Sequence, residues 1–225
     1  MNLTLFDLDG TLIELDSDHA FGQFLVEAGW VDRDQFKRRN DQFYADYVAG
    51  TLDIATYIDF ATAAWRHRPD SDAQAVRARF MREVIEPALD ERATELVRRH
   101  QSAGDRIAIV TATNEFVTRP IADLFGIETL LAVELERDGH GRVTGRVQGV
   151  PTFREGKVVR VEQWLAALGR RVPDFDRITV YGDSLNDLPL LEWATHPVAT
   201  NPGAALEALA RKRGWPILRL FQSPR

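Results

Sequence analysis

Acidic side chains stand where two apolar runs of this sequence end. The first run, residues 3–8, contains Asp7 and is followed at once by Asp9. A later run is followed by Asp183, with Asp187 four residues further on. Side chains two residues apart in a strand point to the same side, so we expect Asp7 and Asp9 to lie together at the carboxyl end of a strand. Carboxylates in such pairs act as nucleophiles, proton carriers or metal ligands.

A hydroxyl and an ammonium group extend this set. Thr111 ends another apolar run, in the segment VTAT, and Lys157 stands near the start of a predicted helix. The carboxyl ends of the strands of a parallel sheet meet at one edge, where ligands bind. We therefore expect the four carboxylates, Thr111 and Lys157 to converge there.

Carboxylates gathered in this way need a positively charged partner or a proton. Two unit charges about 4 Å apart repel by roughly 4 kcal/mol at an effective dielectric constant of about 20. Only oxygen ligands are available, which indicates a hard cation, and Mg²⁺ is favoured. Mg²⁺ also binds phosphate oxygens, and a hydroxyl and an ammonium group suit the phosphate oxygens that remain. The set therefore indicates phosphoryl chemistry.

Each motif has a simpler explanation when it is taken alone. An Asp-Gly pair such as Asp9 and Gly10 is common in turns, threonine is frequent in strands, and lysines on helices are usually exposed to solvent. The combination of these motifs, in this order and at strand ends, is what favours a site.

The apolar pattern also predicts the elements that position the site. Strands are expected at residues 3–8, 106–112 and 177–183, and after residue 87 strands alternate with helices, which indicates a parallel sheet with helices on both faces. Within about residues 16–86, apolar stripes at helical spacing predict about four helices.

These elements predict a two-part chain. The fold class is α/β, with a Rossmann-like parallel sheet in a core domain formed by residues 1–15 and 87–225 and an inserted all-helical cap domain formed by residues 16–86. A hairpin is expected around residues 138–141, and residues 215–220 are expected to form an edge strand or a packed tail. Pro120 is expected in the first turn of its helix, where proline is tolerated.

The composition excludes several classes of site. The chain of 225 residues contains no cysteine, which excludes disulfides, thiolate metal sites and a cysteine nucleophile. A net charge of −6 gives no reason to expect a nucleic-acid partner. No apolar run reaches the roughly 20 residues that span a bilayer, and no signal peptide is evident, so we expect a cytoplasmic protein without a membrane partner.

Four segments carry a resemblance to a known family. DLDGTL, VTAT, REGKV and GDSLND resemble, in this order, the four motifs of the haloacid dehalogenase superfamily of aspartyl phosphotransferases. The helical insert between the first two motifs and the hairpin before the third are similar to subfamily IB, the phosphoserine-phosphatase-like branch with a C1-type cap. The resemblance spans the whole chain.

The resemblance implies a role for each motif residue. Asp7 would be the nucleophile and Asp9 the general acid and base, while Mg²⁺ would be held by Asp7, the backbone carbonyl of Asp9, Asp183 and Asp187. The residues implied to bind the phosphoryl oxygens are Thr111, Lys157 and Asn186.

The entrance to the helical insert has two interpretations. Asp16 or Asp18, with His19, would bind a cationic part of the substrate, because phosphoserine phosphatases carry an acid at about the position of Asp16. Asn114 would also contact the substrate. The same DSD segment also suits the N-terminus of a helix, where an aspartate caps free backbone amides.

The resemblance implies a Mg²⁺-dependent phosphatase that hydrolyses a small phosphomonoester through an aspartyl-phosphate, with phosphoserine or histidinol phosphate as candidate amine-bearing substrates. A phosphotransferase or mutase with the same chemistry, and a phosphate-binding module without catalysis, are the alternatives. The only partner expected is the small-molecule substrate, and both a monomer and a homodimer stay open.

Overall fold

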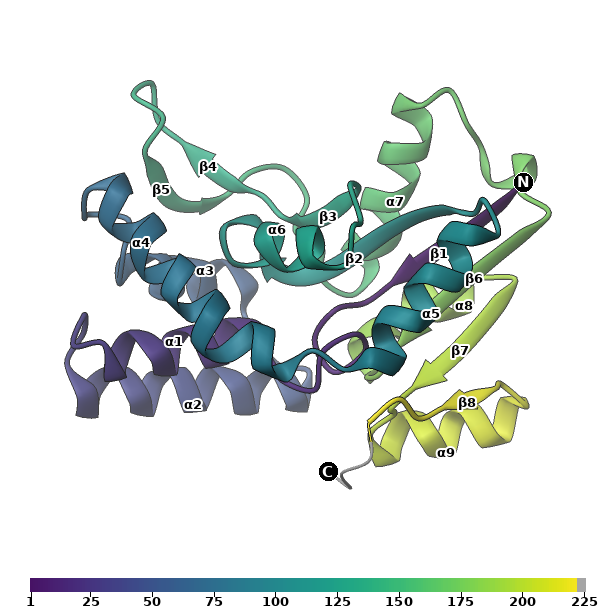
Figure 1. The fold of residues 1–225 in the computed structure, drawn as a ribbon, viewed down its shortest axis with the longest axis horizontal. Coiled ribbons are helices and arrows are strands. Elements are labelled where there is room, and N and C mark those ends of the chain that lie inside the picture. Colours follow the sequence, from purple (N-terminus) through teal and green to yellow (C-terminus); the bar gives the residue numbers. More distant parts are fainter. Residues whose placement is uncertain (222–225) are drawn as a thin grey trace.

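A central parallel sheet organises the protein. In the computed structural model, which describes residues 1–221, six strands pair in the order β3-β2-β1-β6-β7-β8, and every pair is parallel (Figure 1). The strands are β1 (Asn2–Phe6), β2 (Arg106–Asn114), β3 (Leu130–Val133), β6 (Arg177–Gly182), β7 (His196–Thr200) and β8 (Ile217–Leu218). The predicted strands are present, and the segment at residues 215–220 provides β8 at the edge. The last four residues of the predicted core domain lie outside the described part.

Helices cover both faces of this sheet, as predicted. They are α5 (Glu91–Ser102), α6 (Glu115–Leu124), α7 (Glu155–Ala167), α8 (Leu188–Trp193) and α9 (Ala204–Arg213). Side chains alternate along β1, so Phe6 packs with α5 and α6, whereas Leu3 and Leu5 pack with α7, α8 and α9 on the other face. Burial on both faces explains why β1 is a nearly continuous apolar run.

Four α-helices lie between β1 and α5 within the described residues, which agrees with the number predicted for the insert. They are α1 (Ser17–Glu27), α2 (Arg33–Ala49), α3 (Ile54–Ala63) and α4 (Asp70–Phe80), and they lie to one side of the sheet (Figure 1). The side chains of Asp16, Asp32 and Asp53 accept hydrogen bonds from backbone amides in the first turns of α1, α2 and α3. The domain boundaries at residues 15–16 and 86–87 stay a prediction.

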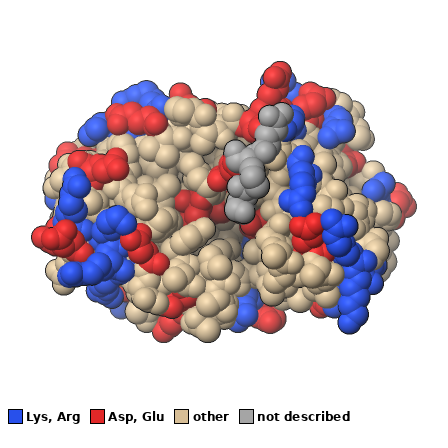
Figure 2. Space-filling model, turned by 90° about the horizontal axis from the view of Figure 1, so that it is seen from below, with Lys and Arg blue, Asp and Glu red and all other residues tan. Residues whose placement is uncertain are grey.

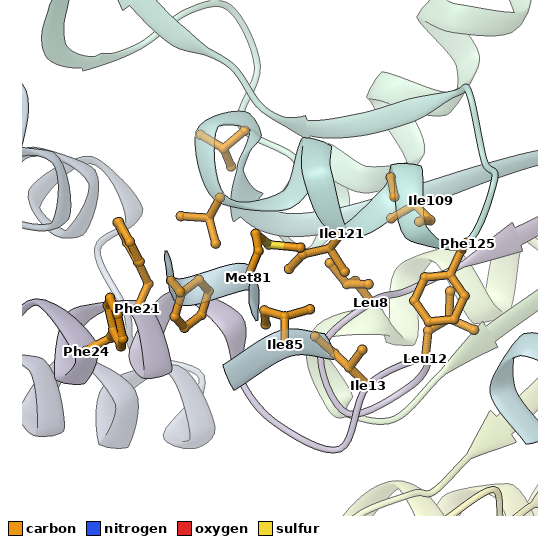
Figure 3. Close-up of a cluster of buried hydrophobic side chains, with 14 of the residues drawn as sticks. Leu8, Leu12, Ile13, Phe21, Phe24, Met81, Ile85, Ile109, Ile121 and Phe125 are labelled. Carbon is orange, nitrogen blue, oxygen red and sulfur yellow. The ribbon is translucent and has the colours of Figure 1, made fainter. Parts of the chain in front are cut away.

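The four helices share an apolar core with the sheet. A π-helical turn, Met81–Ile85, and a 3₁₀ turn, Glu86–Ala88, lead from α4 back towards α5. Figure 3 shows Met81 and Ile85 between Phe21 of α1 and Leu8, which follows β1. No described helix is both long and apolar enough to cross a membrane.

The predicted hairpin also contacts the inserted helices. Strands β4 (Leu135–Arg137) and β5 (Val143–Val147) pair antiparallel, and β5 packs against α3. Gly145 has a φ of 91°, and a side chain there would collide with the guanidinium of Arg66, which pairs with Asp59. A glycine at this position therefore lets β5 approach α3 closely.

The placement of Pro120 differs from the expectation. Helix α6 begins at Glu115, so Pro120 lies in its second turn rather than its first. Proline has no amide hydrogen for the carbonyl four residues earlier, which belongs to Phe116. Arg77 of α4 donates to that carbonyl at 2.9 Å, and its guanidinium lies 4.6 Å from the centre of the Phe116 ring. An arginine from the inserted helices thus replaces the hydrogen bond that the proline removes.

Because Arg77 takes the place of the amide that Pro120 lacks, we expect the effects of substitutions at Arg77 and Pro120 on stability to be coupled. Arg77→Ala should lower the free energy of unfolding by about 1–2 kcal/mol, because it removes the donor to the Phe116 carbonyl. In a Pro120→Ala background the same change should cost less, since the alanine supplies a backbone amide. Urea unfolding of the four proteins gives the coupling energy. Arg82→Ala, at an exposed position close by in the chain, is the control, and equal costs of Arg77→Ala in both backgrounds would contradict the interpretation.

Candidate active site

The end of β1 places Asp7 and Asp9 at the carboxyl edge of the sheet. The amide of Asp7 donates to the carbonyl of Tyr181 at 2.9 Å, which continues the pairing of β1 with β6. Gly10 has a φ of 77°, a left-handed conformation that turns the chain away after Asp9. Asp7 is buried and Asp9 half-buried, so both carboxylates are removed from most of the solvent.

Lys157 joins the first and last motifs. Its ammonium lies 2.6 Å from Asp7 Oδ1 and 2.6 Å from Asp187 Oδ1, and its side chain is fully buried. Burial lowers the pKa of Lys157, but the charges of Asp187 and Asp7 outweigh this and raise the pKa above its usual value. Lys157 therefore stays charged and offsets part of the repulsion between the two acids.

Three carboxylates form a cluster beside Lys157. Asp7, Asp183 and Asp187 each offer an oxygen, and these oxygens lie within 4.8 Å of one another. Asp187 Oδ2 accepts from the amide of Asp183 at 3.1 Å, which folds the chain after β6 back on itself. A side chain at Gly182 would lie 2.8 Å from Asp187 Cβ, so a glycine is needed where β6 ends.

The cluster lacks sufficient positive charge. Burial and repulsion from Asp187 raise the pKa of Asp7 to about 7, although Lys157 acts in the opposite direction. A raised pKa means that the ionised cluster needs more positive charge than Lys157 provides. An all-oxygen donor set of this kind fits Mg²⁺.

Asp9 has a different environment from Asp7. Its Oδ1 accepts from the amide of Ser17 at 2.8 Å, and its Oδ2 accepts from the Thr113 hydroxyl at 2.8 Å. Burial and the nearby Asp16 raise the pKa of Asp9 to about 7, while these hydrogen bonds lower it. A carboxyl group with such a pKa can both give and take a proton near neutral pH.

The residues expected to bind phosphate lie in different places. Thr111 is buried at the end of β2, and its hydroxyl accepts from the amide of Thr113 at 3.1 Å. Asn186 points instead towards α2, where its side-chain amide donates to the carbonyl of Tyr47 at 3.1 Å. Asn186 therefore ties the loop after β6 to the inserted helices.

The residues expected to bind the substrate are gathered at the start of α1 and α6. Asp16 caps α1 by accepting a hydrogen bond from the amide of His19 at 2.8 Å, as one of the two interpretations of this segment expected. Asp16 also lines a pocket beside Asp9. Asp18 accepts from Asn114 Nδ2 at 3.1 Å, and Asn114 caps α6. His19 lines the same pocket, but its ring bonds to Asp41 at 2.9 Å.

Several residues that line or support this site were not predicted from the sequence. Ser17 and Thr113 hold Asp9, while Tyr47 and Tyr57 line the pocket next to it. Thr113 had a signal, since it is two residues after Thr111 and a strand places both on one side. The tyrosines had none, because Tyr47 belongs to an apolar helical stripe and Tyr57 lies next to one.

A cleft gives access to this arrangement. It runs between the C-terminal end of α2 and the loops after β1, β6 and β7, and Asp9, Asp16, Arg154 and Asp183 are among the residues that line it. Figure 2 shows the face with this hollow, with acidic side chains around it.

The comparisons with known proteins agree with this geometry. The family model of haloacid dehalogenase-like hydrolases matches residues 4–192. A histidinol-phosphatase of Neisseria meningitidis is 42% identical over 217 residues, which cover 96% of this chain and 98% of that protein.

Solved structures show the same fold. A protein of unknown function from Bordetella pertussis is 45% identical, with a TM-score of 0.92 and coverage of 98% of this chain and 99% of that one. A substrate-bound phosphoserine phosphatase is 17% identical with a TM-score of 0.68, covering 96% of this chain and 91% of that one.

These findings confirm the predicted family, the fold class and the enzyme class of a phosphoric monoester hydrolase. In the structure, Lys157 lies between Asp7 and Asp187, and Asp183 lies in the same carboxylate cluster. The chain belongs to the haloacid dehalogenase-like hydrolase family.

Proposed function

We propose that this protein is a Mg²⁺-dependent phosphatase that hydrolyses a small phosphomonoester through an aspartyl-phosphate. The observation that carries the proposal is the position of Lys157, whose ammonium lies 2.6 Å from both Asp7 and Asp187. A buried nucleophilic carboxylate beside a fixed cation suits attack on a phosphate dianion, because the cation offsets the repulsion between the two anions.

The metal ligands in this proposal are Asp7, Asp183 and Asp187, with the backbone carbonyl of Asp9. The three carboxylates fit a hard cation because their oxygens approach within 4.8 Å of one another. Mg²⁺ in this place supplies positive charge that favours the ionised form of Asp7 and neutralises charge on the phosphoryl group.

The chemistry then divides between Asp7 and Asp9. A carboxylate oxygen of Asp7 attacks phosphorus, the bond from phosphorus to the alcohol oxygen breaks, and Asp9 gives its proton to that oxygen. In the second half Asp9 takes a proton from water, the water oxygen bonds to phosphorus, and the bond to Asp7 breaks, which releases inorganic phosphate. The hydrogen bonds from Ser17 and Thr113 hold the Asp9 carboxyl group in place throughout.

Thr111, Lys157 and Asn186 bind the phosphoryl oxygens in this proposal. For Asn186 this requires a change of partner, because its amide donates to the carbonyl of Tyr47 in α2. The inserted helices, residues 16–86, act as a cap that completes the substrate site and excludes water.

The substrate in this proposal carries an amine. Asp16, Asp18 and His19 of the inserted helices line a pocket beside Asp9, where the alcohol part of a bound monoester would be. Asn114, at the end of β2, donates to Asp18. Histidinol phosphate and phosphoserine are the two candidates, and the similarity to a histidinol-phosphatase supports the first.

Hydrolysis of p-nitrophenyl phosphate tests the proposed function. We expect phosphate release with Mg²⁺, its loss in EDTA, and its recovery when excess Mg²⁺ is added. Asp7→Asn should lower turnover by about 10³-fold or more, because the attacking carboxylate is lost, whereas the exposed Asp34→Asn should behave like the wild type.

Two results would count against the proposal. Activity that persists in EDTA would exclude the metal, and normal turnover by Asp7→Asn would exclude the nucleophile. Product analysis with a second alcohol present distinguishes hydrolysis from transfer, because a transferase or mutase would give a new phosphate ester instead of inorganic phosphate.

A further inference from the structure

The cleft that leads to the candidate active site is acidic, with one exception. Its volume of about 780 Å³ suits a small molecule, and its lining includes four carboxylates, those of Asp9, Glu14, Asp16 and Asp183. Arg154 is the one lysine or arginine among the described residues that line it. A phosphate monoester carries about two negative charges near neutral pH, so the carboxylates repel a phosphate group that enters the cleft. Arg154 is the side chain there that attracts it.

The guanidinium of Arg154 has hydrogen-bond donors to spare. Arg154 is half-buried, and within residues 1–221 its guanidinium makes no hydrogen bond or ion pair and has one ring contact, 5.7 Å from the ring centre of the neighbouring Phe153. It lies against the end of α2, since a Cβ at Gly50 would be 2.9 Å from Nη2 of Arg154. An arginine presents five N–H donors in a planar fork that matches phosphate oxygens. These donors are available to a ligand in the cleft.

The backbone of Arg154 has a conformation that arginine rarely adopts. The amide of Gly156 donates to the carbonyl of Phe153 at 2.9 Å, which closes a four-residue turn at the start of α7. In this turn Arg154 has a φ of 51° and a ψ of −120°. These angles belong to the first central position of a type II′ turn, which favours glycine because other residues are strained there. Strain of this kind is concentrated at functional sites, so an arginine here indicates a role for its side chain beyond folding.

Arg154 precedes the phosphoryl site on the way in from solvent. Lys157 follows it by three residues, and the ammonium of Lys157 is fully buried between Asp7 and Asp187. Arg154 instead lines the open cleft, together with Asn186. A phosphate group that approaches through the cleft therefore meets the guanidinium of Arg154 before it reaches the ammonium of Lys157.

We infer that Arg154 is a further phosphate-binding residue, whose guanidinium binds the phosphate group of the substrate in the cleft and binds inorganic phosphate before its release. This inference rests on the proposed function and extends the phosphate path outwards from Lys157. The contact is made with the phosphate group and not with the alcohol, so it serves every monoester alike. It contributes affinity for substrate and product, and the chemical step does not depend on it.

The kinetics of two variants test this inference. Arg154→Gly removes the guanidinium, whereas Arg154→Lys keeps the charge without the planar fork. We expect Arg154→Gly to raise the KM for p-nitrophenyl phosphate by about tenfold, as the loss of a charge-assisted hydrogen bond predicts. Its kcat should not fall, because the contact is equally strong before and during the reaction. Arg154→Lys should recover part of the affinity, and the exposed Arg170→Gln should behave like the wild type.

Binding of inorganic phosphate tests the inference independently of catalysis. With Mg²⁺ present, phosphate should raise the melting temperature of the wild type and of Arg170→Gln. The phosphate concentration needed for half of this effect should be about tenfold higher for Arg154→Gly. Equal concentrations for the wild type and Arg154→Gly would overturn the inference. If no ester is hydrolysed, the proposed function fails, and phosphate binding still decides the role of Arg154.

A comparison of esters identifies the group that Arg154 binds. Arg154→Gly should raise the KM for p-nitrophenyl phosphate and for phosphoserine by similar factors, since both carry the phosphate group. A KM that rises for phosphoserine and stays unchanged for p-nitrophenyl phosphate would assign Arg154 to a carboxylate on the alcohol part, and this would overturn the inference.

The stability of Arg154→Gly provides the folding control. Glycine adopts the backbone angles of residue 154 without strain and is tolerated at a helix N-cap. The strain that is released should outweigh the extra freedom of glycine in the unfolded chain. Without phosphate, the variant should therefore melt at least as high as the wild type, although it binds phosphate less tightly. A lower melting temperature together with unchanged phosphate binding would mean that Arg154 only holds the end of α2 against the core, which would overturn the inference.

Discussion

Asp9→Asn is expected to accept a phosphoryl group from p-nitrophenyl phosphate and then to hold it. The p-nitrophenolate anion leaves without help from an acid, so Asp7 can still be phosphorylated. Water attack on the aspartyl-phosphate needs a base, and an asparagine amide cannot take the proton. General acid–base catalysis contributes about 10²–10⁴-fold, and the second half of the reaction should slow by that factor.

The local geometry should survive this substitution. The side-chain carbonyl of the introduced asparagine can accept from the Ser17 amide, and its NH₂ group can donate to the Thr113 hydroxyl, which is able to accept as well as donate. The loss would therefore reflect the missing proton transfer and not a displaced side chain.

Rapid-quench measurements check this expectation. Asp9→Asn should release about one p-nitrophenol per active site in a burst, followed by slow turnover, and the protein should gain the mass of one phosphoryl group. Asp7→Asn should show neither the burst nor the added mass. A slow steady state without a burst in Asp9→Asn would mean that Asp9 acts before phosphorylation, or that Asp7 is not the nucleophile.

The elements that position the site were predictable because each has a local signal. Burial on both faces makes β1 a nearly continuous apolar run, and the turn at Gly10 marks its end. Asp7 and Asp187 come together because they follow β1 and β6, adjacent parallel strands whose carboxyl ends meet, and Lys157 reaches both from the first turn of α7.

The pocket beside Asp9 was only partly predictable, because it depends on contacts between segments far apart in the chain. Asp18 meets Asn114, 96 residues away, and nothing near either residue in the sequence indicates the pair. Asp16 shows why local patterns left two alternatives open, since it caps α1 and also lines the pocket. Pro120 was misplaced for a similar reason: its position in the second turn depends on Arg77, which comes from α4.

Lys157→Met is the second substitution from which we expect a large effect. Methionine has a similar length and no charge, so the change leaves Asp7 and Asp187 buried without the ammonium that lies 2.6 Å from each. Breaking a buried ion pair by removing one partner costs about 3–5 kcal/mol of stability. Turnover should fall by about 10²–10³-fold, because a fixed charge that stabilises the transition state is lost.

Metal ions should restore much of the stability that this variant loses. The oxygens of Asp7, Asp183 and Asp187 still lie within reach of one cation, and without Lys157 their mutual repulsion is no longer offset from within the protein. A cation therefore gains more by binding to the variant than to the wild type. The Mg²⁺ concentration needed for half of the thermal stabilisation should accordingly be lower for Lys157→Met than for the wild type.

Unfolding in urea with EDTA, and again with Mg²⁺, separates the two contributions of Lys157. In EDTA the variant should be less stable than the wild type and than Lys212→Met, a control at an exposed position on α9. With Mg²⁺ the difference in stability should shrink while the loss of turnover persists, because the phosphoryl oxygens still lack the ammonium. If Mg²⁺ restores turnover along with stability, Lys157 serves only to neutralise the acids and does not bind the phosphoryl group. If the deficit in stability is the same with and without Mg²⁺, the three carboxylates do not hold the metal.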